Sequence, residues 1–234
     1  MKKIIILILF LLILLVVFFN FVESKSDDNI LKIINNSEIK DRIETVKTKI
    51  NDYKKINSKN QYVNSFSINY DKEMIIYEIK KSIKDNFNKS EINQLNNWYE
   101  SELGKKIKYL NNTNITKELA VKIINDIEPL KNKERLIRIF EINKIHKYSY
   151  FDYRLFSYIV EKSKLYMENM DLTENKMRNQ TIAFLMYKYQ TLSLEELDEY
   201  LNFLESNLAV KFINLYKTSL ENSLIDTFEV SYKG

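Results

Sequence analysis

The sequence predicts an all-α protein, a multi-helix bundle that follows an N-terminal signal or anchor segment. Three observations favour helices. The 234 residues include only two glycines and one proline, although sheets and tight turns need both residue types. Apolar residues recur every three or four positions along most of the chain, which is the spacing of one helix face. One helical pattern also occurs twice, at residues 88–110 and 193–215.

The chain begins with two lysines and a segment, residues 4–22, that is apolar except for Asn20. A positive start followed by an apolar stretch is typical of an export signal. As a helix the segment would be about 28 Å long, close to the ~30 Å hydrocarbon thickness of a bilayer. Residues 1–24 are therefore either a signal peptide or an uncleaved membrane anchor. Residues 25–234 are predicted to be an exported helical domain, either periplasmic or held at the cell envelope by residues 4–22.

The first half of the exported domain is divided by polar helix starts and by one stretch without period. Asp27 and Asp28 can cap a short helix, and Ser37 starts a longer one whose apolar residues form a single stripe. Residues 57–70 lack a helical period and are interpreted as a loop. The helices expected before residue 112 are 30–35, 37–56, 71–87 and 88–111.

The second half begins with a helix from Thr116 that ends near residue 127, because Pro129 disfavours the helical conformation just before it. Pro129 is also the best internal boundary of the chain. The next helices are expected at 131–147, 149–170, 173–190 and 193–228. The last of these is predicted to be continuous, because nothing in its sequence stops a helix.

The two copies of the helical pattern match at a separation of 105 residues. Each copy starts with a polar cap residue and a glutamate three positions later, which predicts a capping box in each. These boxes pair Asn88 with Glu91 and Ser193 with Glu196. The identical pairs are Glu91/Glu196, Asn97/Asn202, Glu100/Glu205, Ser101/Ser206, Leu103/Leu208, Lys106/Lys211 and Leu110/Leu215.

We expect both copies to pack in one core, with Trp98 and Phe203 buried, and they define pseudo-repeat halves at 71–128 and 173–228. Gly104 in the first copy corresponds to Ala209 in the second. Glycine inside a helix costs about 1 kcal/mol relative to alanine. We therefore interpret Gly104 as a mid-helix position where the backbone of a neighbouring helix comes close.

The copies resemble a helix motif, F-Y-x-S-P-x-G-K/R, that marks an exported, all-helical bacterial family of unknown function. Glu102 and Asn207 stand where that motif has proline, so we expect straighter helices than the motif implies. The resemblance implies export and an all-helical fold, and it brings no known reaction. The residues that carry it, interpreted as structural, are Trp98, Tyr99, Ser101, Gly104, Lys105, Phe203 and Ser206.

Composition points away from several classes of function. The net charge of +4 is mild and both signs are interspersed, which disfavours nucleic-acid binding, and the absence of cysteine excludes disulfides and thiolate metal sites. We predict no catalytic, cofactor-binding or metal-binding residue. The single histidine, His146, is expected to cap a helix end or lie on the surface. Glu100 and Glu205 leave one alternative open, a carboxylate-dependent enzyme that cleaves cell-wall glycan.

An aromatic run at residues 148–158 points all round a helix, which a single core-facing stripe does not explain. One interpretation is a central helix with partners on several sides. The other is an exposed groove for a glycan or peptide, in which the ligand or partner surface would consist of Tyr148, Tyr150, Tyr153 and Tyr158. We expect a non-catalytic binding or scaffolding module whose partner is an unknown envelope protein or cell-wall component.

Overall fold

The computed structural model of the chain describes residues 27–56, 59, 61–111, 133–163 and 174–233. Within these ranges every regular element is a helix and no strand occurs, which confirms the predicted all-α class. The predicted signal or anchor segment, 1–24, and the helix expected at 116–127 lie outside the described residues. None of the described helices has both the length and the apolar character that crossing a membrane requires.

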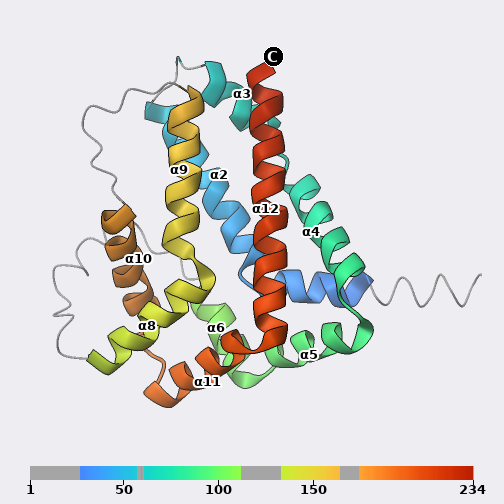
Figure 1. The fold of residues 1–234 in the computed structure, drawn as a ribbon, viewed down its shortest axis with the longest axis vertical. Helices are drawn as coiled ribbons and strands as arrows, with labels where there is room; N and C mark the ends of the chain where they lie inside the picture. Colours follow the sequence, from blue (N-terminus) through green and yellow to red (C-terminus); the bar gives the residue numbers. More distant parts are fainter. Residues whose placement is uncertain (1–26, 57–58, 60, 112–132, 164–173, 234) are drawn as a thin grey trace, which may run out of the picture.

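The first described helix covers residues 27–36, and the helices labelled in Figure 1 follow it along the chain. They are α2 (Ile39–Ile56), α3 (Gln61–Asn69), α4 (Lys72–Asn86), α5 (Lys89–Tyr99), α6 (Glu102–Asn111), α8 (Lys133–His146), α9 (Tyr148–Ser163), α10 (Glu174–Lys188), α11 (Leu194–Glu205) and α12 (Asn207–Lys233).

The longest helix, α12, runs through the middle of the bundle (Figure 1). It packs along α4 on one side and also contacts α3, α5 and α11. The helix α8 packs against both α10 and α11, while α9 contacts α3, α8 and α10. The second motif copy, which consists of α11 and the start of α12, therefore lies at one end of the bundle, and the first copy lies beside the start of α12 (Figure 1).

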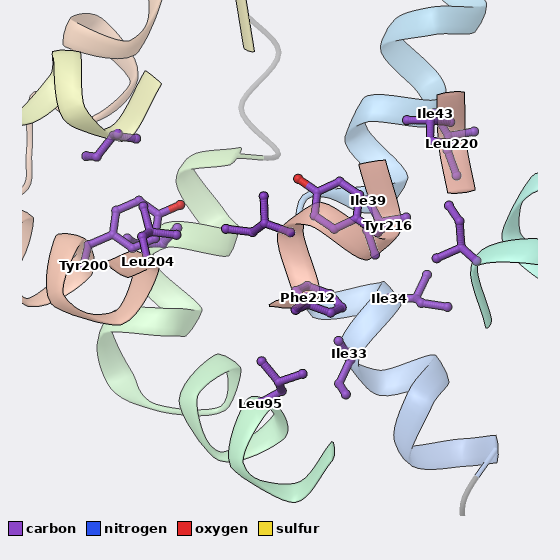
Figure 2. Close-up of a cluster of buried hydrophobic side chains, with 14 of the residues drawn as sticks. Ile33, Ile34, Ile39, Ile43, Leu95, Tyr200, Leu204, Phe212, Tyr216 and Leu220 are labelled. Atoms are coloured by element: carbon purple, nitrogen blue, oxygen red, sulfur yellow. The ribbon is translucent and has the colours of Figure 1, made fainter. Parts of the chain in front are cut away.

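Isoleucine and leucine stripes from many helices meet in one core (Figure 2). The first described helix and α2 bury Ile33 and Ile39, while α12 buries Phe212 and Leu220, and all four side chains are fully buried. Burying one such side chain contributes about 1.5–3 kcal/mol, so long helices with regular stripes are stabilised mainly by tertiary packing.

One predicted loop is wrong, because residues 57–70 contain the helix α3. This short segment has little helical period of its own, but it packs against α2, α9 and α12. Its Val63 is buried, and the hydroxyl of Tyr70 donates to the carbonyl oxygen of Ile43 at 2.7 Å. Tertiary contacts thus stabilise a helix that local sequence does not predict.

The prediction of straight, continuous motif helices is also wrong, because each copy bends and forms two helices. The first copy comprises α5 and α6, and the second comprises α11 and the start of α12. The hydroxyl oxygen of Ser101 accepts from the backbone N–H of Gly104 at 3.0 Å, and Ser206 does the same for Ala209 at 3.2 Å. A serine in this position caps a new helix, so the conserved serine of both copies marks the bend.

Gly104 therefore lies in the first turn of α6 rather than in the middle of a helix. A Cβ atom at this position would press against the backbone carbonyl oxygen of Trp98 and would lie 2.9 Å from the Cα of Tyr99. The expected close backbone approach is present, but the backbone belongs to the end of α5, immediately before the bend. No side-chain rotation can relieve a clash with backbone atoms, so the tight bend favours glycine.

Both predicted capping boxes are confirmed. The glutamate of each box accepts from the backbone N–H of its cap residue at 2.8 Å. The side chains of Asn88 and Ser193 accept from the backbone of Glu91 and Glu196 at 3.0 and 3.1 Å. Each box satisfies two backbone donors at a helix start, which fixes where α5 and α11 begin.

The two copies contact each other reciprocally. Lys106 of the first copy binds Glu196 of the second at 2.7 Å, and the equivalent Lys211 binds Glu91 at 2.7 Å. Between these ion pairs the two equivalent rings, Trp98 and Phe203, stack with centroids 3.6 Å apart and planes 8° from parallel. Each position of one copy thus contacts the partner position of the other copy, and the reverse contact is also present. This pattern indicates an approximate two-fold relation between the copies, as in a symmetric dimer interface.

The reciprocal contacts confirm that the two copies share one core. Trp98 and Phe203 are partly buried and pack against the main hydrophobic cluster, while Leu103 is buried and Leu208 is half-buried. The pseudo-repeat halves predicted at 71–128 and 173–228 extend beyond these copies. Residues 112–128 of the first half lie outside the described part of the chain.

Candidate functional site

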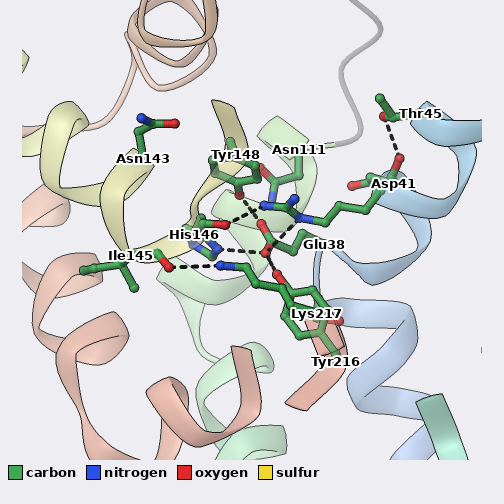
Figure 3. A network of polar contacts seen from close by, with 12 residues as sticks. Glu38, Asp41, Thr45, Asn111, Asn143, Ile145, His146, Tyr148, Tyr216 and Lys217 are labelled. Carbon is green, nitrogen blue, oxygen red and sulfur yellow. Dashed lines mark hydrogen bonds and ion pairs between the residues drawn. The ribbon is translucent and has the colours of Figure 1, made fainter. Parts of the chain in front are cut away.

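A buried carboxylate, Glu38, is the centre of the most concentrated group of ionisable side chains among the described residues. It occupies the bend between the first described helix and α2, and its side chain is 8% exposed. The hydroxyls of Tyr148 and Tyr216 both donate to it, and Nδ1 of His146 lies 2.7 Å from Oε1 (Figure 3). Nε of Arg42, one helical turn on, lies 3.4 Å from the same oxygen. A buried charge requires partners of this kind.

We call this group the Glu38 cluster, and it joins elements that are far apart in the sequence. Nε2 of His146 lies 3.0 Å from the hydroxyl of Tyr200 on α11. The guanidinium of Arg42 stands over the ring of Tyr148, 4.1 Å from its centroid. The cluster consists of Glu38, Arg42, His146, Tyr148, Tyr200, Tyr216 and Lys217.

Two basic side chains of the cluster cap the end of α8. Arg42 donates to the carbonyl oxygen of His146 at 3.1 Å, and Lys217 donates to that of Ile145 at 3.0 Å. The last carbonyls of a helix lack helical partners and carry partial negative charge, which favours cations there. The chain then turns at Lys147, whose φ of 49° is left-handed, and α9 begins. The Glu38 cluster thus fastens the joint between α8 and α9.

The environment sets the charge of each member. Burial raises the pKa of Glu38, but His146, Arg42 and the hydrogen-bond donors outweigh burial and hold that pKa well below its usual range. Burial lowers the pKa of His146 despite the nearby carboxylate, which favours the neutral ring. These two directions compete, and we assign an ionised Glu38, because the permanently charged guanidinium of Arg42 favours the carboxylate whatever the state of the ring.

The contact between His146 and Glu38 is close but poorly aligned. Nδ1 lies 2.7 Å from the carboxylate oxygen, yet it is buried without a hydrogen bond of acceptable geometry. It therefore acts mainly through charge, and the cost of burying a charged ring outweighs the attraction of the carboxylate. Within the described part of the chain no carboxylate lies at such a distance from Nζ of Lys217, and burial lowers the pKa of this lysine to about 7.

A small cavity adjoins the cluster. It measures about 10 Å³, which is room for roughly one water molecule. Both motif copies contribute to its walls. Its polar lining includes Asn36, Glu38, Asn111 and His146, and its aromatic lining consists of Trp98, Tyr99, Tyr200 and Phe203.

The order carboxylate, imidazole, hydroxyl is the order in which enzymes activate a nucleophile, and here it runs through Glu38, His146 and Tyr200. Access differs from that of an enzyme site. Tyr200 is only 3% exposed, burial raises its pKa well above the usual value, and the neighbouring cavity has room for a water rather than a substrate. In this arrangement the three groups can hold and exchange protons, and they do not present a nucleophile to a bound molecule.

The structure does not place the four tyrosines of the predicted ligand surface on one surface. Tyr148 belongs to the Glu38 cluster, whereas Tyr150 is 44% exposed, with the guanidinium of Arg154 5.8 Å from its ring centroid. Tyr153 and Tyr158 are half-buried. The side chains of the two phenylalanines in this run lie outside the described part of the chain.

The residues that carry the family resemblance form the bends of the two copies. Trp98, Tyr99 and Phe203 are in mutual ring contact, and the two serines cap the helices that follow the bends. Gly104 permits the close approach within the first bend, and Lys105 is exposed on α6. Their placement gives most of this set a structural role in the bends.

Sequence reasoning missed most of the Glu38 cluster. It placed His146 near a helix end, which is correct, but the expected surface position is wrong, because the residue is 3% exposed. One usable signal was present in α12. Lys217 follows Ile213 by four residues and precedes Leu220 by three, so a charge occupies the apolar stripe of the helix.

Comparison of the chain with protein-family models, with curated proteins and with solved structures gives no match. The resemblance to the exported helical family therefore stays a prediction from the motif. Within the described residues, no group of histidine and carboxylate side chains is arranged to hold a metal ion.

Proposed function

We propose that the protein is an exported helical module of the cell envelope that binds or scaffolds another component. The observation that carries this proposal is the contrast between the enclosed ionisable groups and the exposed apolar ones. The side chains of the Glu38 cluster bind one another and the end of α8, next to a cavity of the size of a water molecule. Large apolar side chains, in contrast, lie open on the outer side of α8 and at the start of α9.

The outer side of α8 is defined by Ile137 and Phe140, which are 54% and 41% exposed. They are three residues apart and so lie on the same face of the helix, while the fully buried Ile139 and Ile142 face the core. Tyr150, at the start of α9, is 44% exposed. Aromatic and large aliphatic groups that become buried in a complex supply much of its binding energy, which makes these side chains suited to a protein or glycan partner.

A capture experiment tests the binding function. Full-length tagged protein is cross-linked in envelope extracts, and the captured components are compared between the wild type and an Ile137→Ser/Phe140→Ser variant. Tyr77→Ser on α4 is the matched control, because Tyr77 is similarly exposed, at 57%, on a different helix. We expect the α8 variant to lose a specific component that the wild type and the control retain. Identical capture by all three proteins would contradict the role of α8.

An enzymatic assay separates this proposal from the carboxylate-dependent alternative. Glu100 and Glu205 are exposed at equivalent places in the two copies, each beside its bend. Purified protein is incubated with isolated sacculi, and Glu100→Gln and Glu205→Gln variants serve as comparisons. We expect no release of soluble glycan. Release that depends on either carboxylate would replace the binding proposal with a glycan-cleaving function.

The location has its own test. The two lysines before residues 4–22 support export, and the intact mass of the protein from its host distinguishes the two forms. A mass that lacks about the first 24 residues indicates a cleaved signal peptide. Retention of these residues together with sedimentation in the membrane fraction indicates an anchor. A full-length protein in the cytoplasmic fraction would contradict export.

A further inference from the structure

The Glu38 cluster brings basic groups from several helices to one carboxylate. Arg42 from α2, His146 from α8 and Lys217 from α12 all lie near Glu38, and all four residues are at most 7% exposed. With His146 and Lys217 neutral, the charges of Glu38 and Arg42 balance. Each proton that the cluster then takes up adds a positive charge to the interior, and Glu38 is the only carboxylate within the cluster to balance it.

We propose that the Glu38 cluster is a pH-sensitive latch, which fastens the α8–α9 joint to α2 and α12 at neutral to alkaline pH and releases it on acidification. The geometry supports a local release, because the basic side chains of the cluster also make the contacts that hold the α8–α9 joint. Arg42 and Lys217 hold the last two carbonyls of α8, and Glu38 holds the first residue of α9, Tyr148. Loss of this cluster would free both sides of the turn at Lys147.

On acidification two side chains of the cluster, Lys217 and His146, each bind a proton. Nζ of Lys217 becomes fully charged beside the guanidinium of Arg42, since burial lowers the lysine pKa to about 7. His146 then gains a proton. Its two ring nitrogens face the carboxylate of Glu38 and the hydroxyl of Tyr200, so a doubly protonated ring must turn the hydroxyl into an acceptor. The cluster then carries three positive charges and one negative charge.

The surrounding elements do not supply the missing negative charge within the cluster. Asp41 and Lys188 attract each other, and Glu221 and Lys147 act on Lys217 in opposite directions. Four described tyrosines also act on the cluster, and because burial raises their pKa values they stay neutral throughout the range. These are Tyr99, Tyr148, Tyr189 and Tyr200.

The sign of the pH effect follows from the lowered pKa values of the two bases. In an open state Lys217 and His146 regain ordinary pKa values of 10.5 and 6.5, so the open state binds more protons than the closed one. The closed state therefore weakens as the pH falls, first through the lysine and then, below 6.5, through the histidine. Glu38 adds to this loss below its ordinary value of 4.5, because the stability that its lowered pKa gives the closed state disappears as the pH falls further.

Hydrogen exchange of the full-length protein at about pH 8 and about pH 5.5, corrected for intrinsic rates, tests the latch. We expect amides of residues 143–150 to lose protection by roughly tenfold or more at the lower pH, because one pKa unit of linkage corresponds to a factor of ten. Amides in the buried faces of α4 and α12 should change less. Fluorescence of Trp98, the only tryptophan and a wall of the adjoining cavity, provides a second readout.

Variants show whether the cluster is the cause. Lys217→Met, and the pair Lys217→Met/His146→Gln, should reduce the pH dependence of exchange at 143–150. Lys144→Met is the matched control, since its side chain is 75% exposed on α8, and it should leave that dependence unchanged. Equal protection at both pH values in the wild type would overturn the proposal. A uniform loss of amide protection across α4, α12 and the joint would also overturn it. Both of these outcomes are measured on the wild type, so they do not depend on whether a variant folds.

Discussion

Each of the two motif copies contains the same kind of bend, but the helices that follow the two bends differ. In each, the serine N–H donates to the carbonyl oxygen three residues earlier at 3.0 Å, and the serine hydroxyl caps the next helix. After the bend the first copy forms α6, whose 10 residues reach the end of a described range, whereas α12 is described over 27 residues. At equivalent positions, Asn111 ends α6 and Tyr216 continues α12 into the Glu38 cluster.

This difference shows that the local motif specifies the bends, whereas the sequence after the second bend brings residues into the Glu38 cluster. Capping boxes, serine caps and an aromatic ring at the position of Trp98 and Phe203 recur in both copies, and they produce two bent units that fit together reciprocally. Apart from Tyr200 in the second copy, the members of the Glu38 cluster come from the extension of α12 and from the ends of other helices. The bends differ in sequence at a few positions, one of which is glycine at 104 and alanine at 209.

The largest effect is expected at the stacked rings. Trp98→Ala should cost about 3 kcal/mol of unfolding free energy, somewhat less than a fully buried tryptophan would because the ring is only partly buried. Phe203→Ala should also be destabilising. The double variant should show a coupling of about 0.5–1.5 kcal/mol, since each ring loses the same partner. Urea unfolding measures all three, and strict additivity would contradict the reciprocal stack.

The bends themselves are compared through Gly104 and Ala209. Gly104→Ala should be destabilising by about 1–3 kcal/mol, because the new Cβ meets the backbone of α5 and the bend must open. Ala209→Gly should cost about 1 kcal/mol or less through the entropy of the unfolded chain. Thermal melts decide, and an unchanged melting temperature in Gly104→Ala would show that the bend has no need of glycine.

The two serine caps should contribute equally. Ser101→Ala and Ser206→Ala each remove one hydroxyl acceptor from a helix start, at a cost of about 1 kcal/mol. The measurement is chemical denaturation of both variants, with Ser→Thr at each position as the control that keeps an acceptor. A cost confined to one copy would mean that surrounding contacts, rather than the cap, determine the bend there.

The smallest effects are expected at the reciprocal ion pairs. Lys106→Met and Lys211→Met each remove one exposed pair, so small decreases in melting temperature of similar size should result. The decreases should shrink as salt is added, because screening weakens exposed charges. An increase in stability from either substitution would show that apolar packing of the side-chain stem matters more than the pair.

Much of the fold follows from short-range sequence. Helix positions depend on periods of three and four residues and on caps that act within one turn, so α2, α4, α8 and α10 could be predicted along with both capping boxes. The serine bends were also local, but the expectation of straight helices treated only proline as a helix breaker. Ser101 and Ser206 show that a hydroxyl acceptor at a helix start can fix a bend without proline.

Tertiary structure decided the features that depend on distant partners. Glu38 receives Tyr216 from 178 residues away and Tyr148 from 110, separations that no local pattern encodes. The short α3 exists because three other helices cover it. Sequence by itself thus determined most of the helical segments and their apolar faces, because those preferences act over a few residues. Packing decided which charges are buried together, because burial and charge pairing depend on the whole set of neighbours.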